Sequence, residues 1–472
     1  SKLITYNYYI IAIKINKFQR MKTHINGMSL GGLDDLCLRK ENEKFSWVMS
    51  ILWIFEGNVE MDQVYQAFRL LLAMYPRFRC SVYGGTNWSR YKWREHPNFN
   101  VHENIETRTL VTGTINELQE VAVGSIPKSM DYNKPLWKAC IIYGINKGKS
   151  SAMVFSWHHC ITDGRGVIRV MLDWTNNNNE NIETVRAFRE NIPTLPSISK
   201  FPASIRTTLM NLGLQIELNH KEYKLSLQRK NLICEKDLVI EPVLSWSNEF
   251  KIFDVSLIKK AFNSTINDLM VTIVYRAIRR YFFEIDRILD DELMLYIPIS
   301  IRSSSDIECH NKSIMLPLFL PLKDSLTIQE ALKQVHNKIM ELKNDNISSM
   351  LTFLVEHCPN RGMFESKTPD TQEGNRFSLA GHGVITNIIG PQKPITFAGQ
   401  KVNNLIGLIP QPDPAFGITI FSYNGTINVS IVNNKMPDYP NSSTRICELI
   451  NVEFETLLSI SKEMLNINLV AN

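Results

Sequence analysis

The residues with the clearest capacity for chemistry lie in one short run, His158-His159-Cys160-Ile161-Thr162-Asp163-Gly164. An imidazole with a pKa near neutrality can remove a proton from a hydroxyl group, and such general-base catalysis typically contributes ~10² to 10⁴ in rate. A tight turn after the histidines would let Asp163 fold back to support the loop, and Gly164 lets the backbone turn sharply. The run therefore predicts base catalysis on an alcohol, with His159 as the base and His158 and Asp163 as support.

Two adjacent histidines at a strand end are more often ordinary half-buried residues than catalytic ones, because short motifs give false matches. The full H-H-x-x-x-D-G pattern between a strand and a helix favours catalysis instead. Ser151–Trp157 is a run of apolar and β-favouring residues, which predicts a strand directly before the histidines. The residues that recur at helical spacing after the motif are Val167, Val170, Met171 and Trp174. The motif is thus expected at a strand-to-helix turn.

Strands and helices mix in both halves of the chain without a regular βαβ repeat. In the first half, Phe45–Phe55 predicts a strand, and apolar residues from Met61 to Leu72 predict a helix that ends before Pro76. The elements predicted in the second half are a helix over Asn267–Phe283, a strand over Leu293–Ile301, a helix over Ile328–Leu342 capped by Ser325 or Thr327, a hairpin of Phe416–Tyr423 and Thr426–Val432 around Asn424-Gly425, and a helix over Arg445–Met464. This mixture predicts an α/β fold of two sandwich domains packed together.

A chain of 472 residues is too long for one ordinary core, so two domains are expected. Residues 176–237 are polar and interrupted by prolines, which predicts an interdomain crossover. Residues 21–175 would then form the N-terminal domain, and residues 238–472 the C-terminal domain. Residues 1–20 are interpreted as an N-terminal extension, with Met21 as a candidate start.

The composition is that of a soluble globular protein, with 44% hydrophobic and 21% charged residues. A formal net charge of +5 without a long basic block argues against nucleic acid as a partner. The same charge is compatible with anionic phosphates or an anionic membrane surface. No apolar run reaches the ~18 residues needed to span a bilayer. The apolar stretch Tyr8–Ile13 is not followed by a small-residue cleavage site, so no signal peptide is expected.

The eight cysteines are scattered singly, at Cys37, Cys80, Cys140, Cys160, Cys234, Cys309, Cys358 and Cys447. No C-x-x-C pair is present for zinc, so we expect no metal site. The dispersion is also not that of a disulfide framework. Reduced thiols fit a cytoplasmic protein better.

Five further segments, in order along the chain, give the motif a family context. They are Met28–Leu38; Pro135-Leu136-Trp137, preceded by Asp131; Thr265-Ile266-Asn267-Asp268-Leu269; Pro298-Ile299-Ser300-Ile301-Arg302, followed by Asn311; and Thr386-Asn387-Ile388-Ile389-Gly390-Pro391. H-H-x-x-x-D-G alone marks only the chloramphenicol-acetyltransferase-like superfamily. Together with these segments it resembles the wax ester synthase/diacylglycerol acyltransferase family over roughly Met28 to Pro437. The chain departs from the family pattern at Ile389, where proline is usual, and at Thr386, where serine is usual.

The resemblance implies two chloramphenicol-acetyltransferase-like domains with a tunnel between them. Acyl-CoA would enter from one side as co-substrate, with no bound cofactor, and a long-chain alcohol or diacylglycerol from the other. His159 would take the hydroxyl proton, the alkoxide would attack the thioester and the CoA thiolate would leave, so Cys160 need not be a nucleophile. If the strand continued that far, the Cys160 side chain would face away from His159. Since such acceptors lie in membranes and droplets, a cytoplasmic enzyme peripheral to the endoplasmic reticulum or lipid droplets is expected.

Each further residue of the resemblance has a structural alternative. The resemblance implies that Arg302 crosses the domain interface to pair with Asp163, because a buried Asp needs a cation; otherwise Arg302 is a surface charge. Asn267 and Asp268 either support the site or cap and begin a helix. The residues that either line a channel or serve packing and turns are Pro135, Leu136 and Trp137, with core packing favoured for Trp137, and Asn387 with Gly390.

Three other activities share parts of this pattern. The acceptor could be a small or secondary-metabolite alcohol. A carrier-protein-dependent condensation-type transferase shares the motif, but a free-standing chain without a carrier domain disfavours it. A catalytically inactive lipid-binding protein is disfavoured by the intact His159, Asp163 and Gly164. Acyl chain length, acceptor identity and oligomeric state stay open on this pattern.

Overall fold

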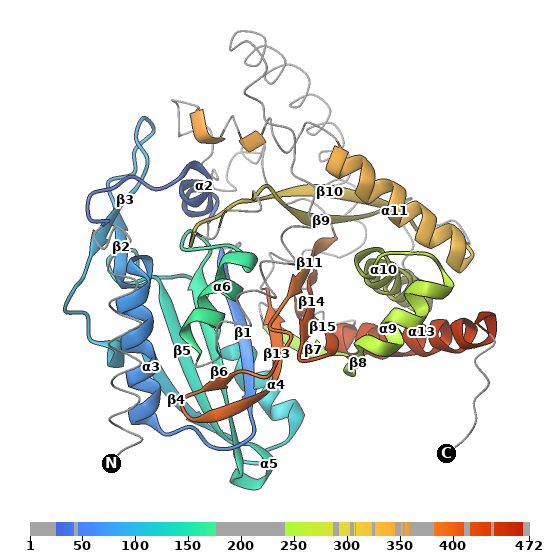
Figure 1. Ribbon diagram of the computed structural model, residues 1–472, viewed down its shortest axis with the longest axis horizontal. Coiled ribbons are helices and arrows are strands. Elements are labelled where there is room, and N and C mark those ends of the chain that lie inside the picture. The colour runs from blue at the N-terminus through green and yellow to red at the C-terminus, as the bar shows by residue number, and fades with distance from the viewer. Residues whose placement is uncertain are drawn as a thin grey trace.

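The structure of the chain is a computed structural model. It describes residues 25–41, 46–175, 241–286, 292–302, 306, 308–322, 326–344, 351–352, 355–357, 382–409, 416–435 and 439–465. The predicted N-terminal extension, the predicted crossover and Ser325 lie outside the described residues. Figure 1 shows two large sheets side by side, with long helices gathered beside the second one.

The first sheet has six strands in the order β12-β13-β1-β6-β5-β4. Its strands are β1 (Val48–Phe55), β4 (Ile105–Thr109), β5 (Trp137–Gly144), β6 (Ser150–His158), β12 (Thr396–Phe397) and β13 (Gln400–Leu408). The elements around it are α2 (Gly32–Lys40), α3 (Met61–Met74), α4 (Ile115–Gly124), α5 (Ile145–Gly148), α6 (Gly164–Trp174), the 3₁₀ turns η1 (Pro76–Arg79) and η2 (Val101–Asn104), and a separate pair of strands, β2 (Cys80–Tyr83) and β3 (Lys92–Glu95).

Strand β6, which leads into the histidine motif, is central in this sheet and buried along its whole length. It pairs antiparallel with β1 on one edge and with β5 on the other. Aromatic rings fill the space between the sheet and the helices α3 and α6. Phe68 stacks on Trp137 with 4.7 Å between ring centroids, and Trp174 lies edge-on to Phe68 at 4.9 Å. Such dense packing fixes the point at which His158 and His159 leave the strand.

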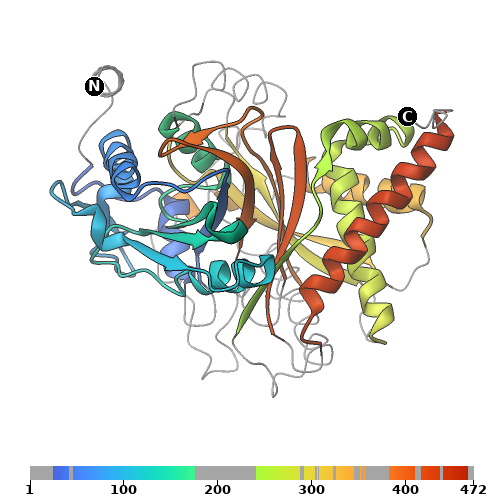
Figure 2. The ribbon, with the colours of Figure 1, turned by 90° about the horizontal axis from the view of Figure 1, so that it is seen from below.

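The second sheet has the order β10-β9-β11-β14-β15-β7, and β8 pairs with β15 at its side. Its strands are β7 (Pro242–Trp246), β8 (Phe250–Lys251), β9 (Glu292–Ser300), β10 (Ser313–Pro321), β11 (Gly383–Ile389), β14 (Phe416–Tyr423) and β15 (Thr426–Asn434). Its helices are α9 (Ile252–Ala261), α10 (Ile266–Glu284), α11 (Ile328–Asn344) and α13 (Ser442–Met464). Figure 2 shows α10 and α13 side by side, on the side of this sheet away from the first sheet.

The segment that contains β12 and β13 joins the two sheets. By sequence β12 and β13 belong to the second half, yet β13 pairs antiparallel with β1 in the first sheet. The side chain of Asn428 in β15 donates a hydrogen bond to the backbone oxygen of Leu405 in β13 at 2.9 Å. Gly407 permits the close approach, because a Cβ at that position would lie 2.3 Å from Thr419 Cγ2. The two halves are therefore joined by the insertion of β12 and β13 into the first sheet as well as by side-chain contacts.

The elements predicted within the described residues are present, with ends that shift by a few residues. Thr327 caps α11 as predicted: its Oγ1 accepts from Glu330 N at 3.3 Å, and the Glu330 carboxylate accepts from Thr327 N at 2.8 Å. Asn424 and Gly425 have φ values of 46° and 82°. Positive φ at both central residues is the backbone of a type I′ turn, so the predicted hairpin is confirmed.

Candidate active site

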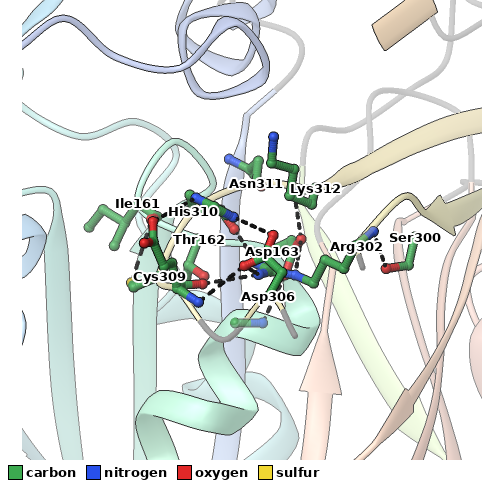
Figure 3. Close-up of polar contacts among 12 residues, drawn as sticks. Ile161, Thr162, Asp163, Ser300, Arg302, Asp306, Cys309, His310, Asn311 and Lys312 are labelled. Atoms are coloured by element: carbon green, nitrogen blue, oxygen red, sulfur yellow. Dashed lines mark hydrogen bonds and ion pairs between the residues drawn. The ribbon is translucent and has the colours of Figure 1, made fainter. Parts of the chain in front are cut away.

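The histidine motif connects β6 to α6, as predicted, and Asp163 lies at the centre of its polar contacts (Figure 3). Asp163 is the N-cap of α6, and its Oδ1 accepts from Gly166 N at 2.8 Å. Gly166 has room only for a hydrogen, because a Cβ would lie 1.8 Å from Thr162 Oγ1. Gly164 is the first helical residue and does not have a positive φ. The lack of a Gly164 side chain instead accommodates Ile388 of β11, which lies 3.3 Å from where its Cβ would be.

His159 is partly exposed, and both its backbone N–H and its backbone oxygen form hydrogen bonds. The backbone N–H donates to Trp47 O at 2.7 Å, and the backbone oxygen accepts a hydrogen bond from Asn311 Nδ2. The imidazole meets the Trp47 ring edge-on at 5.6 Å between centroids. Its Nδ1 lies 3.9 Å from Cys37 Sγ of α2. Trp47 and Cys37 therefore contact the ring, and Asn311 from the second half of the chain holds the backbone that carries it.

Burial lowers the pKa of the His159 imidazole below its ordinary value, because a charged ring is poorly solvated there. The negative charge of Asp163 and the nearby Asn311 side chain act in the opposite direction without cancelling the effect of burial. The lowered pKa keeps the ring neutral at neutral pH. A neutral imidazole is the form that can accept a proton from an alcohol.

His158 lies in the protein core and contacts a different set of groups. Its Nδ1 accepts from Cys160 N at 3.1 Å, so Nε2 carries the ring proton. That Nε2 lies 3.5 Å from a Glu41 carboxylate oxygen, and the same oxygen accepts from Tyr132 Oη at 2.7 Å. Burial raises the pKa of Glu41, but the adjacent His158 ring and the hydrogen bonds from Tyr132 Oη and Trp47 N outweigh it and hold the pKa below its usual value. The buried His158 ring therefore lies between the backbone of the loop, at Cys160, and the Glu41 carboxylate.

The ion pair expected between Asp163 and Arg302 is present (Figure 3). Arg302 Nη2 lies 3.0 Å from Asp163 Oδ1, and Nε lies 3.3 Å from Oδ2. Lys312 N also donates to Oδ2, at 2.8 Å. Burial raises the pKa of Asp163, but Arg302 and the backbone donors outweigh it and hold the pKa below its usual value. The segment after β9 and the start of α6 are thereby tied together across the two halves.

A buried carboxylate that the motif analysis did not single out, Asp34 of α2, connects three parts of the site. It is 2% exposed, and its Oδ1 accepts from Asn311 N at 2.9 Å and from Asn311 Nδ2 at 3.0 Å. Its Oδ2 lies 2.9 Å from Arg77 Nη1, and Arg77 donates to Ile161 O at 3.0 Å. The sequence offered a hint of Asp34 and Asn311, because Asp34 lies within one family-like segment and Asn311 follows another. No motif in the sequence pointed to Arg77.

The cysteines near the motif are free thiols, of which Cys37 and Cys160 are buried and Cys309 is partly exposed. Strand β6 ends at His158, so the alternation that would have directed Cys160 away from His159 does not reach it. Burial raises the pKa of the Cys160 and Cys37 thiols well above the ordinary value, and raises that of Cys309 to about 11. A protonated thiol is a weak nucleophile. The surroundings of these cysteines thus give no support to thiol catalysis.

The Pro135-Leu136-Trp137 segment packs the core and aligns the motif. Trp137 is fully buried, and its Nε1 donates to Phe78 O at 2.7 Å. The backbone oxygen of Leu136 accepts from His158 N at 2.9 Å, and that of Pro135 accepts from Asn104 Nδ2 at 3.1 Å. Trp137 thus packs in the core of the first sheet, and Leu136 holds the end of β6 in register.

Asn267 and Asp268 lie in the first turn of α10, but neither is its N-cap. That cap is Thr265, whose Oγ1 accepts from Asp268 N at 3.1 Å. Asn267 Oδ1 accepts from Asn387 Nδ2 at 3.1 Å, which joins α10 to β11. Asp268 Oδ2 lies 2.8 Å from His336 Nδ1 on α11. These contacts orient α10 against its neighbours.

Gly390 follows β11 and lies against β14. Its N–H donates to Ser422 O at 2.9 Å. A Cβ at Gly390 would lie 2.4 Å from the same oxygen, so only glycine allows this approach. The turn after β11 is therefore held to β14, near the point at which Ile388 contacts the start of α6.

Among the residues that the structure describes, no group of three or more His, Cys, Asp and Glu side chains could hold a metal ion. Within the same part of the chain, every helix is too short or too polar to cross a bilayer.

Two solved structures share the fold of this chain. A solved wax ester synthase/diacylglycerol acyltransferase from Marinobacter aquaeolei VT8 matches with a TM-score of 0.57 at 16% identity, over 92% of this chain and 100% of that one. A trichothecene 15-O-acetyltransferase from Fusarium sporotrichioides matches with a TM-score of 0.58 at 11% identity, over 90% of this chain and 94% of that one. The chain thus has the two-domain, mixed α/β, chloramphenicol-acetyltransferase-like fold that the resemblance implied.

Sequence comparison identifies the family. The wax ester synthase/diacylglycerol acyltransferase catalytic domain matches residues 30–216, and the C-terminal domain of the same family matches residues 311–457. The O-acyltransferase WSD of Acinetobacter baylyi is 25% identical over 401 residues, which are 80% of this chain and 86% of that protein. The chain belongs to the wax ester synthase/diacylglycerol acyltransferase family and is an O-acyltransferase.

Proposed function

We propose that the chain transfers a fatty acyl group from acyl-CoA to the hydroxyl of a long-chain alcohol or a diacylglycerol, which yields a wax ester or a triacylglycerol. The observation that carries the proposal is His159, a partly exposed imidazole with a lowered pKa, held from both halves of the chain. Family membership supports the lipid acceptor and acyl-CoA as the acyl donor. No resident cofactor or metal enters the proposed chemistry.

In the proposed reaction, His159 removes the hydroxyl proton as the alcohol oxygen attacks the carbonyl carbon of the thioester. The C–S bond then breaks, and the CoA thiolate takes the proton back from the imidazolium. Ester and free CoA form without an acyl-enzyme. Since Nδ1 faces the buried thiol of Cys37, we assign proton transfer to Nε2. The substrates would meet at this nitrogen in a tunnel between the two domains.

The remaining predicted residues have positioning roles in this proposal. The pair of Asp163 and Arg302 holds the loop that carries His159. Leu136 and Trp137 hold the strand before it, and Asn267 with Asn387 orients α10 on β11. None of these residues is proposed to exchange a proton with substrate.

Asn311 has a more direct place in the proposal. Its Nδ2 is used by His159 O and Asp34, whereas its Oδ1 is buried with no hydrogen-bond partner among the residues that the structure describes. The Asn311 side chain also raises the pKa of the His159 ring, as an acceptor near an imidazole does. We propose that Asn311 Oδ1 stabilises the imidazolium after proton transfer.

This proposal predicts a pH effect for Asn311→Ala. A general base works only when unprotonated, so the wild-type rate should fall in acid through the pKa of His159, below pH 6.5. Removal of an acceptor that favours the charged ring lowers this pKa further. The acid limb of kcat/KM should therefore move to lower pH, while the plateau falls by up to about a hundredfold from misplacement of the loop. An unchanged acid limb with a lower plateau would leave Asn311 a purely structural residue.

The acceptor is tested directly with palmitoyl-CoA and a series of alcohols from ethanol through hexadecanol to diacylglycerol. We expect ester formation with hexadecanol or diacylglycerol, measured by release of free CoA and by chromatography of the product, and little with ethanol. His159→Ala serves as the control for contaminating activity. Transfer to short, water-soluble alcohols alone would instead indicate a small-alcohol acyltransferase. Absence of transfer from any acyl-CoA would contradict the proposed reaction.

We further propose that the enzyme works in the cytoplasm and associates reversibly with the surface of the endoplasmic reticulum or lipid droplets. Long-chain alcohols and diacylglycerols partition into such surfaces. The cysteines of the described residues are free thiols, and all but Cys309 are buried, which is compatible with a reducing compartment. Electrostatic association of this kind weakens with salt, so the protein should leave the membrane fraction at high ionic strength.

A further inference from the structure

The pair of strands β2 and β3, here called the β2–β3 hairpin (residues 80–95), stands outside both large sheets and carries an exposed tryptophan. Trp88, in the connecting loop, is 74% exposed. Val82 and Trp93 on the inner face of the hairpin are buried in the core of the first domain. Single exposed apolar side chains are common on proteins, so Trp88 alone assigns no role.

The tip that presents Trp88 is held rigidly. Thr86 and Ser89 form a reciprocal bridge, with backbone N–H to oxygen distances of 3.0 and 3.2 Å. Arg39 of α2 is buried, pairs with Asp35 at 2.8 Å, and donates from Nη2 to Thr86 O at 3.0 Å and to Ser89 O at 2.8 Å. A buried, charge-paired arginine is thus used to fix the loop, and Trp88 is displayed with little conformational freedom.

Two exposed cations accompany the tryptophan. Lys92 and Arg94 are exposed on β3, on the opposite face from Trp93. Neither forms an ion pair with any residue that the structure describes; Arg94 instead lies over the Tyr83 ring, 4.6 Å from its centroid. The hairpin therefore combines an exposed tryptophan at its tip with two exposed cations on β3.

We propose that the tip of the β2–β3 hairpin is a contact site for an anionic lipid surface. Tryptophan prefers the boundary between headgroups and acyl chains, where its ring is partly buried and its N–H stays hydrated. Lysine and arginine near such a surface are attracted to anionic headgroups. Trp88 enters the boundary, and Lys92 and Arg94 bind the headgroup phosphates and carboxylates. This inference rests on the proposed function, because a lipid acceptor would be dissolved in the surface that the hairpin contacts.

The hairpin is also placed next to the catalytic region. Helix α2 supplies Arg39, which fixes the tip, and Cys37, which lies 3.9 Å from His159 Nδ1. The tip and the proposed base are therefore linked through residues less than one helical turn apart. Figure 1 shows β3 and α2 close together at the same end of the first domain, while α5 lies at the other end. Docking through the hairpin would bring this side of the enzyme to the lipid surface.

The test is flotation of the full chain with vesicles of phosphatidylcholine, with and without phosphatidylserine, at low and high salt. We expect binding to the anionic vesicles at low salt. Lys92→Gln combined with Arg94→Gln should weaken it by roughly fivefold for each cation. Trp88→Ser should also weaken binding to the anionic vesicles, although Lys92 and Arg94 are both retained. The matched controls are Lys147→Gln with Lys149→Gln, which removes two exposed lysines near α5, and Val111→Ser, which removes another exposed apolar side chain.

Each outcome bears on the inference. Loss of binding in the hairpin variants but not in the controls supports it. Loss of transfer to vesicle-borne hexadecanol, with transfer to detergent-solubilised hexadecanol retained, supports it as well. Equal binding by all variants, or no binding by the wild type, overturns it. If the wild type binds vesicles through the hairpin but transfers no acyl group, the proposed function fails and the contact site stands. If it transfers acyl groups and binds independently of the hairpin, only the contact site fails.

Discussion

His159→Ala should lower the rate of acyl transfer by at least about 10²-fold, the loss expected when a general base is removed. The substitution removes the ring and leaves the peptide groups that hold the loop, since Trp47 O and Asn311 Nδ2 bind only the backbone. The protein should therefore fold normally. The rate is measured as release of CoA from palmitoyl-CoA with hexadecanol, and the fold by circular dichroism and thermal melting.

His158→Ala is the matched comparison, because it removes the same ring one residue earlier. His158 is fully buried and faces Glu41, whose lowered pKa keeps it charged. Its loss leaves a cavity and a buried carboxylate with one partner fewer, so stability should fall by about 2–4 kcal/mol. The rate should fall less than in His159→Ala. Equal and small losses of rate in both variants would remove His159 as the base.

Features set by residues close together in the chain were predictable from the sequence. The strand before the histidines, the helix after them and the cap at Thr327 follow from local patterns that only one structure satisfies. The turn at Asn424-Gly425 required two positive φ values, and that dipeptide tolerates them. Trp137 was predicted to pack because a large apolar ring is costly to expose, and it is fully buried.

Contacts between distant segments required more than local pattern. No periodicity indicates that β13 pairs with β1, or that Asp34 joins Asn311 and Arg77. Any buried carboxylate needs donors, but the sequence does not show which of many arginines and amides supply them. The pair of Asp163 and Arg302 could be anticipated because the family resemblance supplied both segments. Glu41, which faces His158, lay outside every motif.

Asp163→Asn should destabilise the protein by about 3–5 kcal/mol and also slow the reaction, because it leaves Arg302 a buried cation without its main partner. The two side chains are only 4% and 3% exposed, and two pairs of atoms meet at 3.0 and 3.3 Å. Asparagine keeps an oxygen that can cap α6, so the charge is the principal loss. Urea unfolding at pH 7 measures the change.

Acid provides an independent check of the same pair. The pKa of Asp163 lies below 3.8 in the folded protein, because Arg302 and the backbone N–H groups outweigh the effect of burial. A carboxyl group with a depressed pKa stabilises the fold above its unfolded pKa, and this contribution is lost as pH falls through the folded value. The stability difference between wild type and Asp163→Asn should therefore be full at pH 7 and shrink below pH 3.8.

A double-mutant cycle with Asp163→Asn and Arg302→Met assigns the effect to the pair. The double variant leaves neither charge alone, so it should be less destabilised than the sum of the single variants, with a coupling of about 1–3 kcal/mol. Asp306→Asn is the control. Asp306 also contacts Arg302, at 3.2 Å, but it is more exposed than Asp163 and shares its charge with His310 at 2.9 Å, so its loss should couple less strongly to Arg302 than that of Asp163. A coupling near zero would mean that the N–H groups of Gly166 and Lys312 hold Asp163 by themselves, and Arg302 would have no part in positioning the loop that carries His159.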